Sequence, residues 1–531
     1  MVDDDIDGAQ MRSARRMSHA EQLARTARRS PEVVAFRFQG VDRTFAELND
    51  RVDRLAGALA TRGVTPGDRV ATLMTNRLEV VETYLAAGRL EAICVPINFR
   101  LVADEVVYIA QDSGSVALVV DEQLAPVARG AREHAAGVAT CLVTSGDPEA
   151  AGPGAEAYEQ ALASAGPPPV VDVAEHDPAF IMYTSGTTGR PKGAVLSHFN
   201  LLMNTMNMIA GMGFRDDDRR WLSGLPLFHI GGLNGILPYL LLGGTSVILP
   251  SGQFDANEVV DLLEREKISA CYFVPTQWQA ICAVPDISSR DLSSLRRISW
   301  GASVAPPSVL QAMADTFPGV PNYNAFGQTE MSSVTCVLKG EDAIRKMGSV
   351  GTPIVNVEVA VVDEDVKPVA QGDVGEIVYR GPTVMQGYWN NPDATEEAFR
   401  GGWFHSGDLV REDEDGFYYV VDRKKDMIIS GGENIYCAEV EAVIDGHPAV
   451  REVAVIGRPD PRWVEVPVAV VVPMDPDAPP SKSDIVEWCR ARMASYKKPA
   501  DIVIVEAMPR NASGKILKTQ LRTQLAPAPD R

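Results

Sequence analysis

The sequence predicts an α/β fold with a large, multi-subdomain α/β domain over residues 1–424 and a small α+β domain over residues 425–531. Short β-rich apolar runs alternate with helical patterns through the first two-thirds of the chain, which is typical of layered α/β domains. The charged cluster Asp422–Asp426, DRKKD, then separates two apolar runs. Strand and helix patterns alternate again after it, over a length sufficient for a separate small domain.

Hydrophobic patterning places the individual elements of the large domain. Ala46–Arg62 reads as an amphipathic helix, and Arg69–Met74 and Val116–Val120 read as strands. Ser145–Pro178 is rich in Ala, Gly, Pro and acidic residues, which indicates a surface excursion or a subdomain boundary. Val355–Tyr379 reads as short strands joined by turns, so we expect a small β subdomain there.

The segment Gly231–Pro250 carries no charge and is long enough to span a bilayer. Asn234, Pro238 and a glycine pair at Gly243 interrupt it, so the sequence predicts a buried helix, a turn and then the strand Thr245–Leu249. The first residues are acidic and lack the basic and apolar regions of a secretory signal, so no export is predicted.

The small domain is expected to contain three strands and two helices beyond the charged cluster. The strand Tyr418–Val421 precedes that cluster, and the apolar run Met427–Ile429 follows it. The later elements read as the strands Val453–Ile456, Val468–Val472 and Ile502–Val505 and the helices Ala438–Ile444 and Ser483–Ser495.

Composition excludes several classes of function. The formal net charge of −21 argues against a nucleic-acid binder and against a protein resting on anionic lipid, because both need clustered cations. The seven cysteines form no C-x-x-C pair and show no metal or disulfide spacing, which favours a reducing cytoplasm. The partner expected is a small-molecule acid, with no membrane span, and a homodimer stays open.

The run Tyr183–His198, YTSGTTGRPKGAVLSH, combines glycines, hydroxyls and one lysine in the manner of a phosphate-binding loop. Glycines let backbone N–H groups approach phosphate oxygens, hydroxyls donate to them, and Lys192 supplies a mobile charge. The spacing differs from that of the common P-loop. Taken alone, the run reads equally well as a polar turn between a strand ending near Met182 and a helix starting near Ser197.

Four further segments follow this run in a fixed order: Asn324–Glu330 (NAFGQTE), Gly402–Leu409 (GWFHSGDL), Asp422–Glu439 (DRKKDMIISGGENIYCAE) and Pro509–Lys518 (PRNASGKILK). Together the five motifs resemble the adenylate-forming superfamily of acyl-CoA synthetases, luciferases and peptide-synthetase adenylation domains, from about Glu32 to Leu521. The chain looks most like actinobacterial fatty-acid or aryl-acid CoA ligases.

The resemblance implies an ATP site with Mg²⁺. Glu330 matches the residue that holds Mg²⁺, Thr329 the hydroxyl at the α-phosphate, and Lys192 a cation at the departing pyrophosphate. Asp408 matches the acceptor of the ribose hydroxyls, with Arg423 beside it, and Phe326 stands where the family usually has Tyr. The remaining nucleotide contacts are expected from Thr184, Ser185, Gly186, Thr187, Thr188, Gly189, Gly301, Ala302, Ser303, Asn324 and Gly327.

The resemblance also implies a mobile small domain. Lys515 matches the lysine that enters the active site for adenylation only, and Lys425 matches the hinge. Rotation at the hinge exchanges Lys515 for the loop that contains Gly431 and Gly432, which faces the site during thioester formation.

The acid pocket is expected between His229 and the strip from Ser299 to Val304. His229 resembles the family's gating residue, although a buried core histidine is the alternative. Gly327 stands where acetate-type enzymes carry a bulky Trp, which favours medium-chain, long-chain or aryl acids. Trp300 departs from the usual small residue and either narrows the pocket or packs behind it.

The acceptor site is expected around Trp463 and Tyr496, which match aromatics that sandwich the adenine of CoA in aryl-CoA ligases. Two departures argue against CoA. Val464 replaces the usual Gly, and a β-branched residue adopts positive φ only at a cost. Ala500 replaces a Lys that meets a CoA phosphate, although Lys497 and Lys498 lie nearby in sequence.

The leading hypothesis is therefore an AMP-forming acyl-CoA or aryl-CoA ligase that uses ATP, Mg²⁺ and CoA. The first alternative keeps adenylation but changes the acceptor or the acid, as in carrier-protein loading or in an ATP-dependent diazotase that activates nitrite for an arylamine. The second is a non-catalytic nucleotide-binding protein, which the presence of Lys192, Glu330 and Lys515 argues against.

Overall fold

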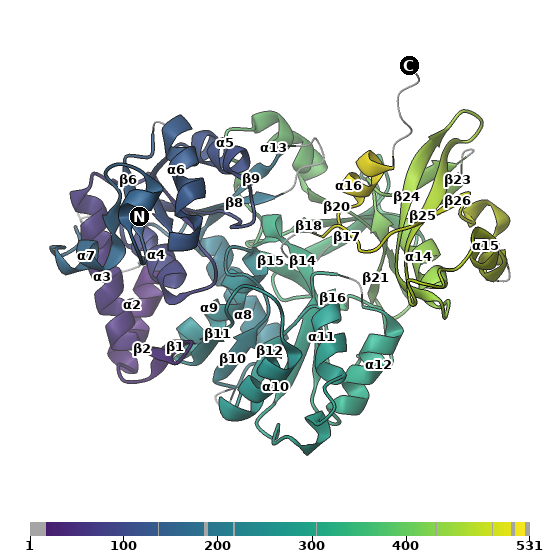
Figure 1. Cartoon of the computed structure of the whole chain (residues 1–531), viewed down its shortest axis with the longest axis horizontal. Coiled ribbons are helices and arrows are strands. Elements are labelled where there is room, and N and C mark those ends of the chain that lie inside the picture. The colour runs from purple at the N-terminus through teal and green to yellow at the C-terminus, as the bar shows by residue number, and fades with distance from the viewer. Residues whose placement is uncertain are drawn as a thin grey trace, which may run out of the picture. The chain divides into compact units, whose positions relative to one another are not determined.

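The computed structural model describes residues 17–135, 137–184, 190–215, 218–303, 305–430, 433–490, 492–510 and 516–525 (Figure 1). The chain divides into two compact units. The larger unit runs to Met347 and includes Gly351–Glu358 and Arg380–Phe404, and the smaller unit holds Gly348–Val350, Val359–Tyr379 and the chain from His405 onward. The predicted boundary between residues 424 and 425 marks the start of the segment expected to rotate. That boundary stays a prediction.

The first sheet of the larger unit has eight strands in the order β19-β9-β8-β4-β3-β5-β6-β7. Its parallel part is built from β3 (Arg69–Leu73), β4 (Ile93–Pro96), β5 (Ser115–Val120), β6 (Thr140–Val143), β7 (Glu156–Ala157) and β8 (Pro178–Thr184). The helices α5 (Ala103–Ser113) and α6 (Ala125–His134) bury their apolar faces against it. The predicted strands at 69 and 116 are confirmed.

The antiparallel edge of this sheet differs from the sequence prediction. β9 (Lys192–Ser197) pairs antiparallel with β8, and β19 (Gly387–Tyr388) pairs antiparallel with β9. The glycine-rich run therefore joins two strands of a hairpin, and the prediction of a direct strand-to-helix turn is wrong. The helix α8 (His198–Gly211) does begin where expected, because Ser197 and Asn200 form a capping box.

The second sheet has nine strands in the order β16-β15-β14-β13-β12-β10-β11-β1-β2. Its strands are β1 (Val34–Phe38), β2 (Val41–Thr44), β10 (Arg220–Ser223), β11 (Thr245–Ile248), β12 (Ala270–Tyr272), β13 (Arg297–Gly301), β14 (Asn322–Gln328), β15 (Ser333–Leu338) and β16 (Thr352–Pro353). The helices α10 (Ala256–Arg265), α11 (Pro275–Cys282) and α12 (Pro307–Thr316) share one hydrophobic core with it (Figure 1).

The remaining helices of the larger unit are α2 (His19–Arg29), α3 (Phe45–Thr61), α4 (Leu78–Arg89), α7 (Tyr158–Ala163), α9 (Ile230–Leu242) and α13 (Pro392–Ala398). The uncharged segment after Gly231 forms α9, a left-handed turn at Gly243 and β11, as predicted. No helix in the described residues is long and apolar enough to cross a membrane. The segment predicted as a surface excursion contributes β7 and α7, whose Tyr158 is fully buried, so it is partly core.

The smaller unit contains most of two sheets. The first joins β17 (Glu358–Val362), β18 (Val374–Arg380), β20 (Phe404–Glu412) and β21 (Tyr418–Arg423). The second joins β22 (Ile428–Ser430), β23 (Glu433–Ile435), β24 (Val450–Asp460), β25 (Val464–Pro473) and β26 (Asp501–Ile504). The helices α14 (Cys437–Asp445) and α15 (Lys482–Arg490) share one core with this second sheet, and α16 (Lys518–Gln524) shares another. α15 is shorter than predicted.

Candidate active site

The hairpin of β8 and β9 fixes both ends of the predicted phosphate loop. Thr184 and Lys192 lie directly opposite each other in the ladder. The chain between them therefore leaves and re-enters the sheet at the same end of β8 and β9. Gly193 is required by packing, because a Cβ there would lie 2.6 Å from Cγ2 of Ile181. Five predicted loop residues, Ser185, Gly186, Thr187, Thr188 and Gly189, lie outside the described residues.

A cluster of four side chains gathers at this sheet edge; we call it the glutamate cluster and define it as Thr184, Lys192, Glu330 and Tyr388. The Thr184 hydroxyl and the Tyr388 hydroxyl each donate to Oε1 of Glu330, at 3.1 Å in both cases. The Lys192 ammonium lies 5.3 Å from the centroid of the Tyr388 ring, within cation–π range. The structure thus brings three sequence-predicted residues together and adds a tyrosine.

The electrostatics of the glutamate cluster follow from burial. Glu330 is only 8% exposed, in the short 3₁₀ turn Thr329–Met331 that also carries the predicted Thr329. Burial, together with the neighbouring Glu330 carboxylate, raises the pKa of the Tyr388 hydroxyl well above its ordinary value. Tyr388 therefore stays protonated and donates a hydrogen bond to Glu330.

The donor set of the glutamate cluster fits Mg²⁺, which prefers hard oxygen ligands and is commonly held by one or two carboxylates plus substrate phosphates. Glu330 supplies one buried carboxylate, and Thr184 supplies a hydroxyl. No group of three or more His, Cys, Asp or Glu residues stands ready for a metal in the described part of the chain. One carboxylate and one hydroxyl suit a metal that is shared with the oxygens of a polyphosphate.

Two asparagines hold the backbone that follows Glu330. Ser332 and Ser333 have φ of 57° and 108°, in the left-handed region that non-glycine residues avoid. The Asn234 amide from α9 donates to the Ser332 carbonyl, and the Asn204 amide from α8 donates to the Val334 carbonyl at 2.8 Å. Asn234 also donates to Asn204 at 2.9 Å. Neither residue was predicted from the sequence. Asn234, a polar residue on the otherwise apolar α9, was an available signal, whereas α8 carries several polar residues.

The predicted purine strip follows β13. A Cβ on Gly301 would lie 2.2 Å from the Ala325 carbonyl and 2.5 Å from the Tyr272 hydroxyl. Only glycine therefore fits at this position, where β13 pairs with β14. Ala302 has a φ of 65°, and Ala302 and Ser303 are exposed. Asn324 is buried in β14, and Phe326 is half-buried in the same strand.

Gly327 lies at a register shift between β14 and β15. A Cβ at this position would lie 1.7 Å from the Ser333 carbonyl oxygen, which is backbone and cannot move aside alone. This backbone therefore excludes any side chain at residue 327.

The two aromatic residues predicted for the acid pocket have different surroundings. His229 caps the amino terminus of α9, where its Nδ1 accepts from the Gly231 N–H at 3.2 Å, and burial lowers its pKa to about 4. The imidazole is thus neutral at physiological pH. Trp300 is 4% exposed and belongs to the core shared with α10, α11 and α12, so it packs behind the strip.

In the smaller unit, the predicted ribose residues form one pair. Asp408 on β20 and Arg423 on β21 are direct cross-strand neighbours, and the Arg423 guanidinium forms a close ion pair with the Asp408 carboxylate. Asp408 is 2% exposed. The ladder therefore places an acceptor and a cation side by side, as the motifs predicted.

The predicted hinge and the catalytic lysine lie at or near gaps in the description. Lys425 is exposed in the turn between β21 and β22, whereas Gly431, Gly432 and Lys515 lie outside the described residues. The chain on both sides of Lys515 is fixed, because Arg510 and Ile516 form a β-bridge and the Leu517 N–H donates to the Pro509 carbonyl at 2.8 Å.

A partly buried ionic network anchors α16, which follows this gap in the described residues. Lys518 lies 2.8 Å from Oε1 of Glu441 on α14, and Arg522 lies 2.8 Å from Oδ1 of Asp426. Burial by itself would raise the pKa of Asp426, but Lys518 and Arg522 hold it below the ordinary value. Asp426 directly follows the predicted hinge residue, so the network ties the start of the small domain to its last helix.

We use the name acceptor face for three exposed residues at positions predicted for the acceptor site: Trp463, Val464 and Tyr496, which are 44%, 68% and 44% exposed. The Arg462 guanidinium lies 4.7 Å from the centroid of the Trp463 ring. Lys497 is held by both oxygens of Glu439 at 2.7 Å.

Val464 corrects one sequence argument. Its φ is 72°, so the chain keeps the left-handed turn despite the β-branched side chain, and the residue pairs with Ser430 of β22. The strain costs on the order of 1–3 kcal/mol. The replacement of Gly by Val thus does not remove the turn geometry, and the argument against CoA from Val464 loses its basis.

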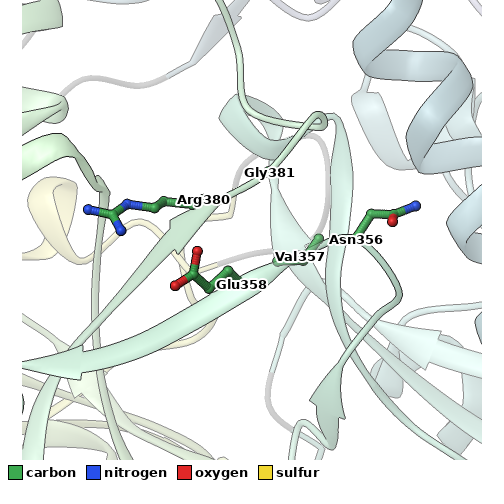
Figure 2. Close-up of a pocket in the computed structure, with 5 residues that line it drawn as sticks. All are labelled: Asn356, Val357, Glu358, Arg380 and Gly381. Atoms are coloured by element: carbon green, nitrogen blue, oxygen red, sulfur yellow. The ribbon is translucent and has the colours of Figure 1, made fainter.

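A separate cavity of about 360 Å³ lies in the larger unit, lined by Asn356, Val357, Glu358, Arg380 and Gly381 (Figure 2). The Arg380 guanidinium stacks on Trp403 at 3.8 Å, and its Nε donates to the Gly402 carbonyl at 2.8 Å. Figure 2 shows Asn356 pointing away from Glu358 and Arg380, so the polar groups do not converge. None of the lining residues belongs to the predicted site.

The chain is similar in sequence and in structure to known enzymes. Residues 23–389 match the AMP-binding enzyme family, and residues 439–515 match the AMP-binding enzyme C-terminal domain. Feruloyl-CoA synthase from Amycolatopsis sp is 43% identical over 500 residues, which cover 94% of this chain and 97% of the relative. Long-chain-fatty-acid–CoA ligase FadD13 from Mycobacterium tuberculosis is 38% identical over 507 residues, with 94% and 97% covered.

Among solved structures, o-succinylbenzoate CoA synthetase (MenE) from Bacillus subtilis, in complex with its acyl-adenylate intermediate, has a TM-score of 0.84 at 33% identity, with 94% and 97% of the two chains covered. The same synthetase is also known with ATP and magnesium ion, which supports the use of both in this family. These similarities confirm the predicted resemblance, the α/β fold with a larger and a smaller domain, and the AMP-forming acid ligase class. They do not favour the diazotase or carrier-loading alternatives.

Proposed function

The chain belongs to the family of AMP-binding enzymes, and on that premise we propose that it activates an aromatic carboxylic acid with ATP and passes the acyl group to CoA. The glutamate cluster is the observation that carries the first half of this proposal. The cluster holds one buried carboxylate and one ammonium beside the ends of β8 and β9, where the glycine-rich segment joins them. Binding of a metal-bound polyphosphate requires such a pair of charges.

In the adenylation step, a carboxylate oxygen of the acid attacks the α-phosphorus of ATP, and pyrophosphate leaves. Lys192 neutralises charge that develops on the departing pyrophosphate, and Lys515 and the Thr329 hydroxyl stabilise the α-phosphate in the transition state. The Asp408 carboxylate accepts from the ribose hydroxyls, while the ion pair with Arg423 orients that carboxylate. Glu330 would hold Mg²⁺, which would supply charge neutralisation on the phosphates.

In the second step, the CoA thiolate attacks the acyl carbonyl, and AMP leaves. Rotation at Lys425 replaces the Lys515 loop by the loop of Gly431 and Gly432. The acceptor face supports CoA as the acceptor, because exposed aromatic rings at Trp463 and Tyr496 offer stacking surfaces for a purine. Lys497 is bound to Glu439, so we assign Lys498 to the CoA phosphates.

The class of acid is proposed from three observations. The relative at 43% identity is a feruloyl-CoA synthase, and an indoleacetate–CoA ligase from Aromatoleum aromaticum is 38% identical, so both act on aromatic acids. The backbone at Gly327 excludes a side chain there, so a bulky residue cannot close the pocket to long acids. Neutral His229 suits a wall near an aromatic substrate.

The cytoplasm is the proposed location. All seven cysteines are free thiols, and burial raises the pKa of Cys94 and Cys271, which keeps both protonated and unreactive.

The experiment is a screen of acids and acceptors read by AMP release. Cinnamic, benzoic, indole-acetic and fatty acids are each tested with ATP and Mg²⁺, with and without CoA. We expect AMP release with an aromatic acid that rises at least tenfold when CoA is added, and formation of the thioester. ATP–pyrophosphate exchange without any gain from CoA would retain adenylation and refute CoA as the acceptor.

A further inference from the structure

We propose that Tyr388 is a positioning residue that keeps the Glu330 carboxylate and the Lys192 ammonium in register, and thereby sets the affinity of the adenylation site for its divalent metal. The inference rests on the proposed function, since it concerns the same ATP site. No sequence motif used above includes this tyrosine.

The first argument is topological. Lys192 begins β9 in the eight-stranded sheet, whereas Glu330 follows β14 in the nine-stranded sheet, so the two charges belong to different sheets. The segment 385–389 is hydrogen-bonded to both. The Met385 N–H donates to the Glu330 carbonyl at 2.8 Å, and the Trp389 N–H donates to the Gly193 carbonyl at 2.7 Å. The short segment that carries Tyr388 is therefore a physical link between the two elements.

The second argument is the use of two different parts of one side chain. The hydroxyl of Tyr388 donates to Oε1 of Glu330, while the ring faces the Lys192 ammonium. Thr184 donates to the same oxygen, so in the described part of the chain both hydrogen bonds to this carboxylate reach Oε1. Two donors from two strands fix the rotation of the carboxylate, so Oε2 is the oxygen that would be available to a metal.

The third argument is that the tyrosine is itself held in place. Its backbone N–H donates to the Thr395 hydroxyl at 2.9 Å, and that hydroxyl donates to the Asn391 carbonyl at 2.8 Å at the start of α13. Gly387 beside it has a φ of 145°, and a Cβ there would lie 2.9 Å from Cγ2 of Thr395. A residue supported in this way can orient its neighbours rather than follow them.

The test separates the hydroxyl from the ring. Tyr388→Phe removes the hydrogen bond to Glu330 and keeps the ring at Lys192, whereas Tyr388→Leu removes both. The matched control is Tyr158→Phe, because the Tyr158 hydroxyl donates to another buried carboxylate of the larger unit, Glu82, at 2.8 Å. Metal binding is measured by titrating Mn²⁺, observed by electron paramagnetic resonance, into the full chain with the α,β-methylene analogue of ATP.

We expect Tyr388→Phe to weaken Mn²⁺ binding about tenfold, the order expected for one hydrogen bond to a charged group. ATP–pyrophosphate exchange should fall by a similar factor at low Mg²⁺ and recover in part at high Mg²⁺. Tyr388→Leu should lose further exchange that Mg²⁺ does not restore. Tyr158→Phe should bind Mn²⁺ within about twofold of the wild type, and in a Glu330→Ala background Tyr388→Phe should cause no further loss.

Three results would overturn the proposal. One is Mn²⁺ binding by Tyr388→Phe within twofold of the wild type, another is tighter Mn²⁺ binding by that variant, and the third is equal losses in Tyr388→Phe and Tyr158→Phe. Thermal melting of each variant identifies losses that arise from folding alone. If none of the tested acids supports ATP–pyrophosphate exchange by the wild type, the proposed function fails. The Mn²⁺ titration still decides the role of Tyr388 in that case.

Discussion

The glutamate cluster of the larger unit and the acceptor face of the smaller unit are built in opposite ways. Glu330 is 8% exposed and is held by hydroxyls from two strands, whereas Trp463 and Tyr496 are each 44% exposed and project from the surface. Fixed, desolvated groups stabilise developing charge most strongly, because no reorganisation is needed during the reaction. Stacking on a flat purine needs only an accessible ring. The difference predicts that the two half-reactions respond to different mutations.

The largest effect is expected for Lys515→Ala. Loss of a cation aimed at the transition state should lower the adenylation rate roughly 10²- to 10³-fold, while thioester formation from a synthetic acyl-adenylate and CoA should stay near the wild-type rate. Pyrophosphate exchange and the isolated second step measure the two separately. Lys482→Ala, at an exposed lysine of the smaller unit, serves as control. Equal loss in both steps would contradict the separation.

The next effect concerns acid sensitivity of the larger unit. His19 on α2 and His198 on α8 are buried, with their Nδ1 atoms 3.0 Å apart. Burial lowers the pKa of His19 to about 4 and holds the pKa of His198 well below its ordinary value. In the unfolded chain the two imidazoles bind protons near pH 6.5, whereas in the folded chain they stay neutral at that pH. The contribution of the neutral imidazoles to the free energy of unfolding is therefore fully present above pH 6.5. It decreases as the pH falls toward 4, by about 3 kcal/mol for His19.

Urea unfolding of the larger unit at several pH values checks this expectation. His19→Asn and His198→Asn should each flatten the decrease between pH 6.5 and 4, and the exposed His134→Asn should leave it unchanged. If the free energy of unfolding is constant over that interval in the wild type, the two imidazoles are not held neutral.

A smaller effect is expected for Trp463→Ala on the acceptor face. Loss of one stacking ring, worth about 1–3 kcal/mol, should raise the KM for CoA about tenfold or more and leave pyrophosphate exchange unchanged. Steady-state kinetics at varied CoA measure it. Trp488→Phe is the control, since Trp488 lies in the same unit and bonds to the Val443 carbonyl. A fall in exchange for Trp463→Ala would show that this face is not confined to the acceptor.

The smallest effect, and a gain, is expected for Val464→Gly. Glycine adopts a φ of 72° without the steric cost that valine bears, so the free energy of unfolding of the smaller unit should rise by about 1 kcal/mol. Val464→Asn, which tolerates the left-handed region, should rise by less. Hydrogen exchange of the β24–β25 hairpin in each variant measures the change. A decrease for the glycine variant would mean that the valine side chain stabilises the turn through packing.

Much of the fold was predictable, because the hydrophobic periodicity of α3, β3, β5 and α9 determines those elements locally. The motifs likewise led to Lys192, Glu330, Asp408 and Arg423. In the structure Lys192 and Glu330 both contact Tyr388, and Asp408 pairs with Arg423. β9 was missed since its apolar run directly continues a glycine-rich loop and ends at a helix cap. Its strand character comes from pairing with β8 and β19, which sequence periodicity does not report.

The missed site residues have a common physical reason. Tyr388, Asn204 and Asn234 act through contacts with residues far away in the chain, and such contacts leave no regular spacing in the sequence. The conformation of Val464 was unexpected for a related reason. Steric preference argues against positive φ at a valine, but the pairing of Val464 with Ser430 and Asp460 in the sheet outweighs that local cost.

The link formed by Tyr388 has a consequence for synthesis of the protein. The glutamate cluster draws on positions 184, 192, 330 and 388, so its last member is translated long after its first. A nascent chain that has emerged only to residue 380 carries the glycine-rich hairpin and Glu330 but not the tyrosine that aligns them. Capture of a metal-bound triphosphate by ribosome-bound intermediates should therefore begin only once residue 388 has left the exit tunnel, before the proposed ribose residue Asp408 emerges.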